Sequence, residues 1–139
     1  MSVLGAPVEG LEPEIRELFA ALDHAGDIAE RAGAQVLTGE AGLEALGTRV
    51  RFSLRVSDER LLEVRYRAYG CPYTLATCEW LARWLEGQRL GALRPGNPIA
   101  WAQQLGVPSA RLGRLLVIED ALLAGLAQCD NSLALNVVK

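Results

Sequence analysis

The sequence lacks the patterns by which several classes of protein are recognised. No window approaches the ~18 uninterrupted apolar residues of a membrane-spanning helix, and residues 1–10 carry no positive charge ahead of a long apolar run. A glycine-rich phosphate loop, a paired-cysteine zinc spacing and a dinucleotide fingerprint are all missing. We therefore expect a cytoplasmic protein without membrane contacts, and nothing supports hydrolase or kinase chemistry.

A concentrated basic region is also missing. The formal net charge of the 139 residues is only -3, and the charged residues are spread along the chain. Nucleic-acid binding needs a basic patch, so no nucleic-acid partner is expected. Half of the residues are apolar, nothing repeats and no linker divides the chain. We expect a single domain over residues 1–139, with a flexible N-terminus (1–10) and C-terminal tail (131–139).

Cysteine and histidine are scarce. The three cysteines are Cys71, Cys78 and Cys129, an odd set that favours reduced thiols over a disulfide framework. The one histidine, His24, falls at the end of the first predicted helix, and we interpret it as solvent-exposed and non-functional. A thiol enzyme built on Cys71 would need a base, and none is identifiable.

Hydrophobic periodicity predicts an α+β fold in which a small antiparallel sheet of about three strands is covered by several helices. Residues 50–56 and 62–68 alternate around a turn at 57–60 and form a hairpin. Residues 27–47 are predicted to be mostly loop, with one short strand at 35–38. The predicted helices run from Pro13 to near Gly26, over 74–86, over 98–105 with Asn97 as its cap, and from Ser109 as a cap to about Leu126.

These elements define a core and an outer sheet face. The predicted core is Val50, Phe52, Leu54, Leu75, Leu85, Leu115, Ile118 and Leu122. The outer face of the hairpin would carry four basic residues, Arg51, Arg55, Arg65 and Arg67. This face is either a solvated strand surface or a basic docking patch.

Cys71 is the candidate site residue. It lies between the end of a strand at Gly70 and a helix that begins near Thr74. Free N–H groups at a helix start carry partial positive charge and favour a thiolate. Cys78 shares a helical face with apolar residues and is predicted to be a core residue. The two thiols cannot bind one metal, because seven helical residues rise about 10.5 Å whereas each zinc-bound sulfur lies ~2.3 Å from the ion.

The order of elements, together with several short segments, resembles the IscU/NifU N-terminal family of iron-sulfur cluster assembly scaffolds. The segments that carry the resemblance are Leu54-Arg-Val-Ser-Asp-Glu, Arg67-Ala-Tyr-Gly-Cys71, residues 84–88, Val107-Pro-Ser-Ala-Arg111 and Glu119-Asp-Ala121. The resemblance implies partnership with a cysteine desulfurase, which donates sulfur. It also implies a chaperone that binds the segment at 107–111.

The resemblance further implies three cysteines and an aspartate that hold zinc or a nascent cluster. Only Cys71 matches; the other ligand positions align with Leu46-Gly47-Thr48 and Arg114. A zinc site rests on four ligands acting together, so zinc is not expected. Arg114 would repel a cation and favour the Cys71 thiolate.

The implied function is that of a scaffold-like carrier, not an enzyme. Cys71 would take sulfur, or would be the single metal ligand that the chain lends to iron or to a transient iron-sulfur cluster. The alternative is a degenerate scaffold that no longer binds a cluster and serves as an interaction module. It would dock through the arginine face or the 107–111 segment.

Overall fold

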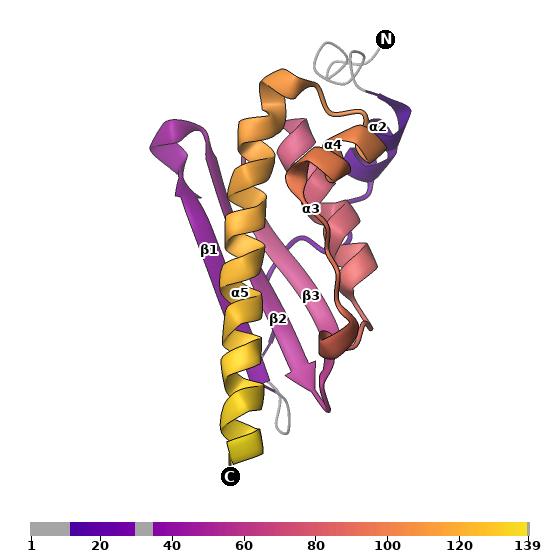
Figure 1. Cartoon of the computed structure of the whole chain (residues 1–139). Helices are drawn as coiled ribbons and strands as arrows, with labels where there is room; N and C mark the ends of the chain where they lie inside the picture. Colours follow the sequence, from indigo (N-terminus) through magenta and orange to yellow (C-terminus); the bar gives the residue numbers. More distant parts are fainter. Residues whose placement is uncertain (1–11, 30–34, 139) are drawn as a thin grey trace.

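The computed structural model describes residues 12–29 and 35–138, with side chains as far as residue 128. One antiparallel sheet has the order β1-β2-β3, and α5 lies across β1 and β2 while α3 packs on β3 (Figure 1). The predicted α+β fold is confirmed. The elements are α2 (Pro13–Ala20), β1 (Gln35–Leu43), β2 (Thr48–Ser57), β3 (Arg60–Tyr69), α3 (Pro72–Leu85), α4 (Pro98–Leu105) and α5 (Leu112–Val138), with short 3-10 helices at Glu44–Leu46, Leu90–Ala92 and Ser109–Arg111.

The core lies between the sheet and the two long helices. Cross-strand partners Phe52 and Tyr66 are both buried, with ring centroids 6.5 Å apart and ring planes at 59°. Such tilted aromatic pairs stabilise a sheet beyond the area they bury. Seven of the eight predicted core residues are buried, and Leu75 is partly buried against the same cluster. The predicted core is therefore confirmed.

The predicted loop at 27–47 is wrong over much of its length. Residues 35–43 form the nine-residue strand β1, of which the predicted short strand is only the first part. The glycines that suggested a loop have a packing role. A Cβ atom on Gly39 would overlap the carbonyl oxygen of Ala121 and the backbone nitrogen of Gly125. Glycine thus allows the backbone of α5 to lie directly on β1.

Alternation over residues 62–68 places Leu62 on the same inward face as Val64 and Tyr66, and this prediction is wrong. Leu62 is 40% exposed, whereas the adjacent Leu61 is fully buried. The β2–β3 pairing shifts at a bulge between Arg55 and Val56. One extra residue in a strand reverses the side of every residue beyond it, so Leu61 takes the inward position.

The first helix ends earlier than its apolar spacing predicts. α2 stops at Ala20, and the following chain pairs with the edge of β3. The Gly26 N–H donates to the Tyr66 carbonyl at 2.8 Å, and the Tyr66 N–H donates to the His24 carbonyl at 3.1 Å. These bonds satisfy backbone groups that a longer helix would leave unpaired at the sheet edge.

The C-terminal helices follow the prediction in part. Asn97 caps α4 by accepting a hydrogen bond from the Ala100 N–H at 2.9 Å, and Gly106 ends the helix with a left-handed φ of 74°. Ser109 is not a helix cap, because it begins a 3-10 turn and α5 starts at Leu112. α5 continues to Val138, through most of the expected C-terminal tail.

In the two ranges that the structure describes, no helix combines the length and apolarity needed to cross a membrane.

Candidate functional site

Cys71 occupies the N-cap position of α3, directly after β3 ends at Tyr69. Gly70 makes the tight connection possible, because a Cβ atom there would lie 2.8 Å from the Thr74 hydroxyl oxygen. Pro72 is the first helical residue, where its missing N–H costs no hydrogen bond. The Cys71 thiol is half-buried, and its Sγ lies 3.7 Å from Thr74 Oγ1.

The surroundings of the Cys71 thiol lower its pKa. Burial alone would raise its pKa, but the backbone and hydroxyl of Thr74, the backbone of Tyr73 and the charge of Arg114 together lower the pKa below its ordinary value. The backbone contribution comes from the first turn of α3, as expected at a helix N-terminus. Cys71 is therefore the more nucleophilic of the two cysteines whose side chains the structure describes.

Residues 46–48, which the resemblance predicts at other ligand positions, lie at the same end of the molecule as Cys71. The register pairs Arg49 with Tyr69, so the β1–β2 turn and the start of α3 share one end of the molecule, at the top of Figure 1. Leu46 is 80% exposed, Gly47 has a φ of 93° and Thr48 is buried. None of them carries a thiol or carboxylate.

Arg114 lies in the first turn of α5. Its Nε atom is buried and has no hydrogen-bond partner within the described ranges. Its charge lowers the pKa of the Cys71 thiol, in agreement with the sequence-based prediction. A guanidinium in this place stabilises a sulfur anion and opposes binding of a free cation.

Cys78 does not join the site. Its side chain is fully buried in the core, as predicted, and burial together with the nearby Glu79 charge raises the pKa of its thiol. Cys129 lies beyond the side chains that the structure describes. Among residues 12–29 and 35–128, no group of three or more His, Cys, Asp or Glu side chains could hold a metal ion.

The predicted arginine face is not a basic patch. Arg55 pairs with Glu63 at 3.1 Å, and Arg67 pairs with Asp27 at 2.8 Å. Arg65 lies 3.0 Å from Glu63 and 3.1 Å from Glu86. Glu63 in the same hairpin, together with Asp27 and Glu86 from outside it, therefore neutralises most of this face.

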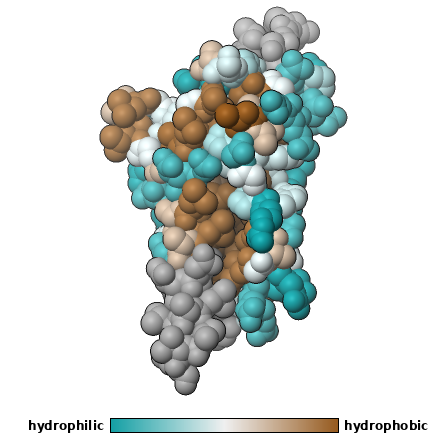
Figure 2. Space-filling view, viewed as in Figure 1, coloured by the Kyte–Doolittle hydropathy of each residue, from teal (hydrophilic) through white to brown (hydrophobic). Residues whose placement is uncertain are grey.

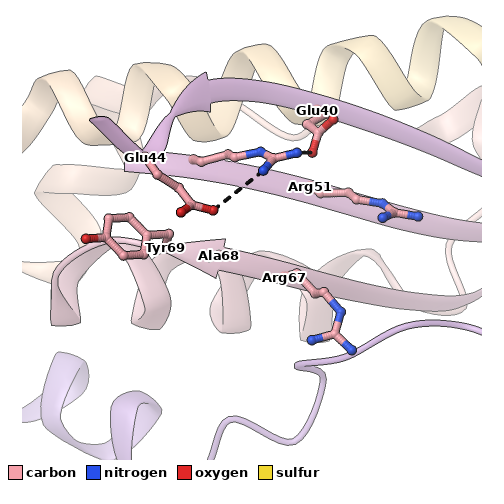
Figure 3. Close-up of a pocket in the computed structure, with 7 residues that line it drawn as sticks. Glu40, Glu44, Arg51, Arg67, Ala68 and Tyr69 are labelled. Carbon is pink, nitrogen blue, oxygen red and sulfur yellow. Dashed lines mark hydrogen bonds and ion pairs between the residues drawn. The ribbon is translucent and has the colours of Figure 1, made fainter. Parts of the chain in front are cut away.

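A shallow pocket of about 360 Å³ lies on the same outer face, close to the end of β3 (Figure 3). Arg49 bridges Glu40 and Glu44 along one side, at 3.5 Å from the latter. Arg51 and Arg67 are direct cross-strand partners on the other side. The pocket presents both signs of charge and is not a selective site for anions.

His24 is not the exposed, unengaged residue that the sequence suggested. Its Nδ1 lies 2.7 Å from Glu79 Oε2 and its Nε2 lies 3.1 Å from Glu86 Oε1. The His24 side chain is only 17% exposed, and Glu79 is fully buried. No sequence pattern joins these residues, which are 55 and 62 positions apart.

Glu79 is the centre of this network. It accepts hydrogen bonds from the His24 N–H at 2.9 Å, the Tyr66 hydroxyl at 3.0 Å and Arg83 Nε at 2.8 Å. Burial alone would raise its pKa, but Arg83, His24 and Tyr66 lower the pKa below its ordinary value. A buried carboxylate is tolerated because its oxygens are fully bonded.

Apolar surface is exposed at two places near the end of the molecule that carries Cys71: the β1–β2 turn, and a groove between α4 and α5. Leu43 and Leu46 in and beside the β1–β2 turn are 60% and 80% exposed. Figure 2 shows apolar surface at the upper left, where Figure 1 places this turn. A groove of about 200 Å³ runs between α4 and the start of α5, and its lining residues are Ile99, Ala102, Gln103, Val107, Ser109 and Leu112.

A three-stranded antiparallel sheet with helices on one face and a cysteine at the strand-to-helix junction defines an α+β scaffold domain. The sequence model of the NifU-like N terminal domain matches residues 12–132. The chain belongs to this family.

The relatives match the chain over different lengths. A bifunctional protein NifU/MnmA from Rubrobacter xylanophilus is 43% identical over 79 residues, which are 56% of this chain and 15% of that protein. The iron-sulfur cluster assembly scaffold protein IscU of Haemophilus influenzae is 26% identical over 102 residues, 70% of this chain and 79% of that protein. The chain thus spans a small part of the first relative and most of the second.

Solved structures show the same fold. A NifU-like protein (N-terminal) from Brucella abortus has a TM-score of 0.64 at 15% identity, covering 94% of this chain and 99% of that one. A putative iron-sulfur cluster assembly scaffold protein for the SUF system from Fervidobacterium islandicum has a TM-score of 0.62 at 13% identity, covering 83% and 95%.

Proposed function

We propose that the protein acts in iron-sulfur cluster assembly as a sulfur carrier, with Cys71 as the acceptor. The observation that carries the proposal is the half-buried Cys71 thiol whose pKa is lowered by the first turn of α3 and by Arg114. Membership of the NifU-like N-terminal family supports a role in iron-sulfur cluster assembly. The absence of further ligands among residues 46–48 and at Arg114 favours transfer of sulfur over storage of metal.

The proposed transfer is a thiol-disulfide type exchange with a cysteine desulfurase. The Cys71 thiolate attacks the outer sulfur of the donor's persulfide, forming a new S–S bond at Cys71. The S–S bond of the donor breaks, and its cysteine leaves as a thiolate, so no net oxidation or reduction occurs. The guanidinium of Arg114 stabilises the anionic sulfur that results.

The chain could carry an iron-sulfur cluster only together with a partner that supplies further ligands. One thiolate from Cys71 can occupy one coordination position of an iron-sulfur cluster, and other proteins or thiols must supply the rest. The chain would then be a carrier and not an enzyme. A stable zinc site is not proposed, because it needs about four ligands.

A second candidate function is an interaction module without sulfur chemistry. The apolar groove beside Val107 and Ser109 favours it, and this groove adjoins the 107–111 segment. Docking through the arginine face receives no such support, because Asp27, Glu63 and Glu86 pair with its arginines.

The test is anaerobic incubation with a cysteine desulfurase and cysteine, followed by intact-mass measurement and absorption spectroscopy after ferrous iron is added. We expect the mass of one extra sulfur atom on the intact chain and on a Cys78→Ala control. Cys71→Ser should gain none, and Arg114→Met should gain less.

The outcomes separate the candidates. Sulfur that loads equally onto Cys71→Ser would overturn the assignment of Cys71. Absence of sulfur on the intact chain would favour the interaction module. Cluster absorption by the isolated chain that survives in Cys71→Ser would show that ligands other than Cys71 hold the cargo.

A further inference from the structure

The network around His24 joins the chain at 21–27 to β3 and to the part of α3 that lies beyond its first turn. The chain at 21–27 is held to α3 and β3 mainly by polar contacts. Arg83 donates to the Ala21 carbonyl at 2.7 Å, His24 contacts Glu79 and Glu86, and Asp27 pairs with Arg67. Two backbone bonds between this segment and Tyr66 complete the attachment.

Apolar attachment of α2 is limited. The helix has eight residues, and Ile15 and Leu18 are its only buried side chains. It has no side-chain hydrogen bond at its N-cap. Isolated helices of this length are unstable in water, so α2 depends on its contacts with α3. Ile15 and Leu18 belong to the same core as residues of β2, α3 and α5, but each of those three elements contributes at least four buried apolar residues and α2 contributes two.

We propose that residues 13–27 form a strap that opens as one unit, and that His24 is the latch that holds it to Glu79 and Glu86. Opening uncovers the surface of α3 against which Ile15 and Leu18 pack, while the sheet and α5 stay folded. Segments with few buried apolar contacts open at lower free energy than the core.

The latch depends on the charge of its carboxylates. Both ring nitrogens of His24 lie within hydrogen-bond distance of carboxylate oxygens, Nδ1 of Glu79 and Nε2 of Glu86. The other charged or titratable groups facing the latch are Arg83 on α3 and Arg65 and Tyr66 on β3. Protonation of Glu79 and Glu86 in acid removes the charged acceptors and releases the strap.

The pKa directions agree with this geometry. Burial alone would raise the pKa of Glu86, but the Val64 N–H, His24 and Arg65 lower it below its ordinary value. The pKa of Glu79 is lowered in the same way. At a pH above the ordinary titration range of carboxyl groups, both carboxylates are charged and hold His24. This contact is lost as the pH falls through their lowered pKa values.

Hydrogen exchange on the full chain tests the strap. In His24→Gln a single amide nitrogen replaces the two ring nitrogens that contact the two carboxylates. We expect amides within residues 13–27 to exchange about tenfold faster than in the unchanged protein, and those of β2 and α5 to change less than about twofold. Asp23→Asn, at an exposed neighbouring position, is the matched control and should change neither.

Two results would overturn the proposal. Equal acceleration in β2 and α5 would show that His24 stabilises the whole fold, and unchanged exchange over 13–27 would show that His24 is no latch. Glu86→Gln alters a carboxylate that is 30% exposed. In this variant amide exchange over residues 13–27 should also accelerate relative to β2 and α5, but by less than in His24→Gln. In the unchanged protein, NMR signals of Gly26 and Tyr66 should change in acid before those of α5; simultaneous loss would contradict a separate unit.

Discussion

Arg114 is the charged residue that acts on the Cys71 thiol. Its buried Nε has no hydrogen-bond partner in the described part of the chain, and its charge lowers the pKa of the thiol. A fixed positive charge favours a thiolate or persulfide anion and disfavours an incoming iron ion. Arg114 is therefore the residue on which the proposed sulfur chemistry can be tested.

Removal of this charge should raise the pKa of the Cys71 thiol. Arg114→Met keeps most of the side-chain volume and abolishes the guanidinium, so the pH profile of alkylation by iodoacetamide should move to higher pH. The measurement is best made in a Cys129→Ala background, with Cys78 protected by complete burial. Arg94→Met is the control for loss of a distant charge. An unshifted profile in Arg114→Met would contradict the electrostatic role of Arg114.

Residue roles could be predicted where the signal is local in sequence. Cys71 comes two residues after the predicted strand and directly before Pro72. That pattern indicates a helix N-terminus. The role of His24 could not be found in this way. Its partners Glu79 and Glu86 are 55 and 62 residues away, and only the packed fold brings them together.

At the scale of elements, the contact between β1 and α5 depends on two glycines. Gly39 on the strand and Gly125 on the helix face each other without side chains between them. The close approach lets α5 cover β1 and β2 along their length (Figure 1). It thereby fixes the start of α5, which carries Arg114, relative to the β1–β2 turn.

Gly39→Ala should therefore be strongly destabilising. The new methyl group would overlap backbone atoms of Ala121 and Gly125, which cannot rotate away as a side chain would. We expect a loss of about 3 kcal/mol or more in the free energy of unfolding, measured by urea denaturation.

Gly113→Ala is the matched control for that change. Gly113 lies in the first turn of α5, and no atom would lie within 4 Å of its new methyl group. Alanine favours the helix by up to about 1 kcal/mol, so this variant should be as stable as the original or more so. Equal stability of Gly39→Ala and Gly113→Ala would contradict the close packing at Gly39.

The limits of prediction at this scale have physical causes. Alternation correctly predicts that residues 50–56 form a strand, because one face is buried and the other is charged. The bulge beside Val56 is invisible to alternation, since it depends on pairing between strands. The part of β1 beyond residue 38 is missed because glycine normally disfavours strands, and the benefit of Gly39 comes only from its contact with α5.

At the scale of the whole molecule, ion pairs join acidic and basic residues from different elements of the described chain. Charges from the 24–27 segment, β3 and the end of α3 meet at the sheet edge, as in the contacts of Arg67 with Asp27 and of Arg65 with Glu86. The Arg67–Asp27 pair is exposed and contributes little to stability, and the Arg65–Glu86 pair is half-buried. Glu79 differs because it is fully buried and links α3, β3 and the strap.

Stability should consequently depend on pH through Glu79. Its pKa is below the ordinary value in the folded protein, so the unfolded chain binds more protons in acid and the free energy of unfolding falls as the pH falls. The stabilisation is fully present above the ordinary carboxyl range near 4.5 and disappears as the pH drops through the lowered folded value.

Glu79→Gln isolates this contribution. At pH 7 the amide cannot replace the charged acceptor of Arg83, His24 and Tyr66, and we expect a loss of about 2–4 kcal/mol by urea denaturation. In acid the native carboxyl becomes neutral as well, so the difference between the two proteins should shrink below pH of about 4.5. Glu14→Gln, at an exposed position of α2, should follow the unchanged protein. A difference that stays constant from neutral pH into acid would show that the network stabilises the fold through shape and not through the charge of Glu79.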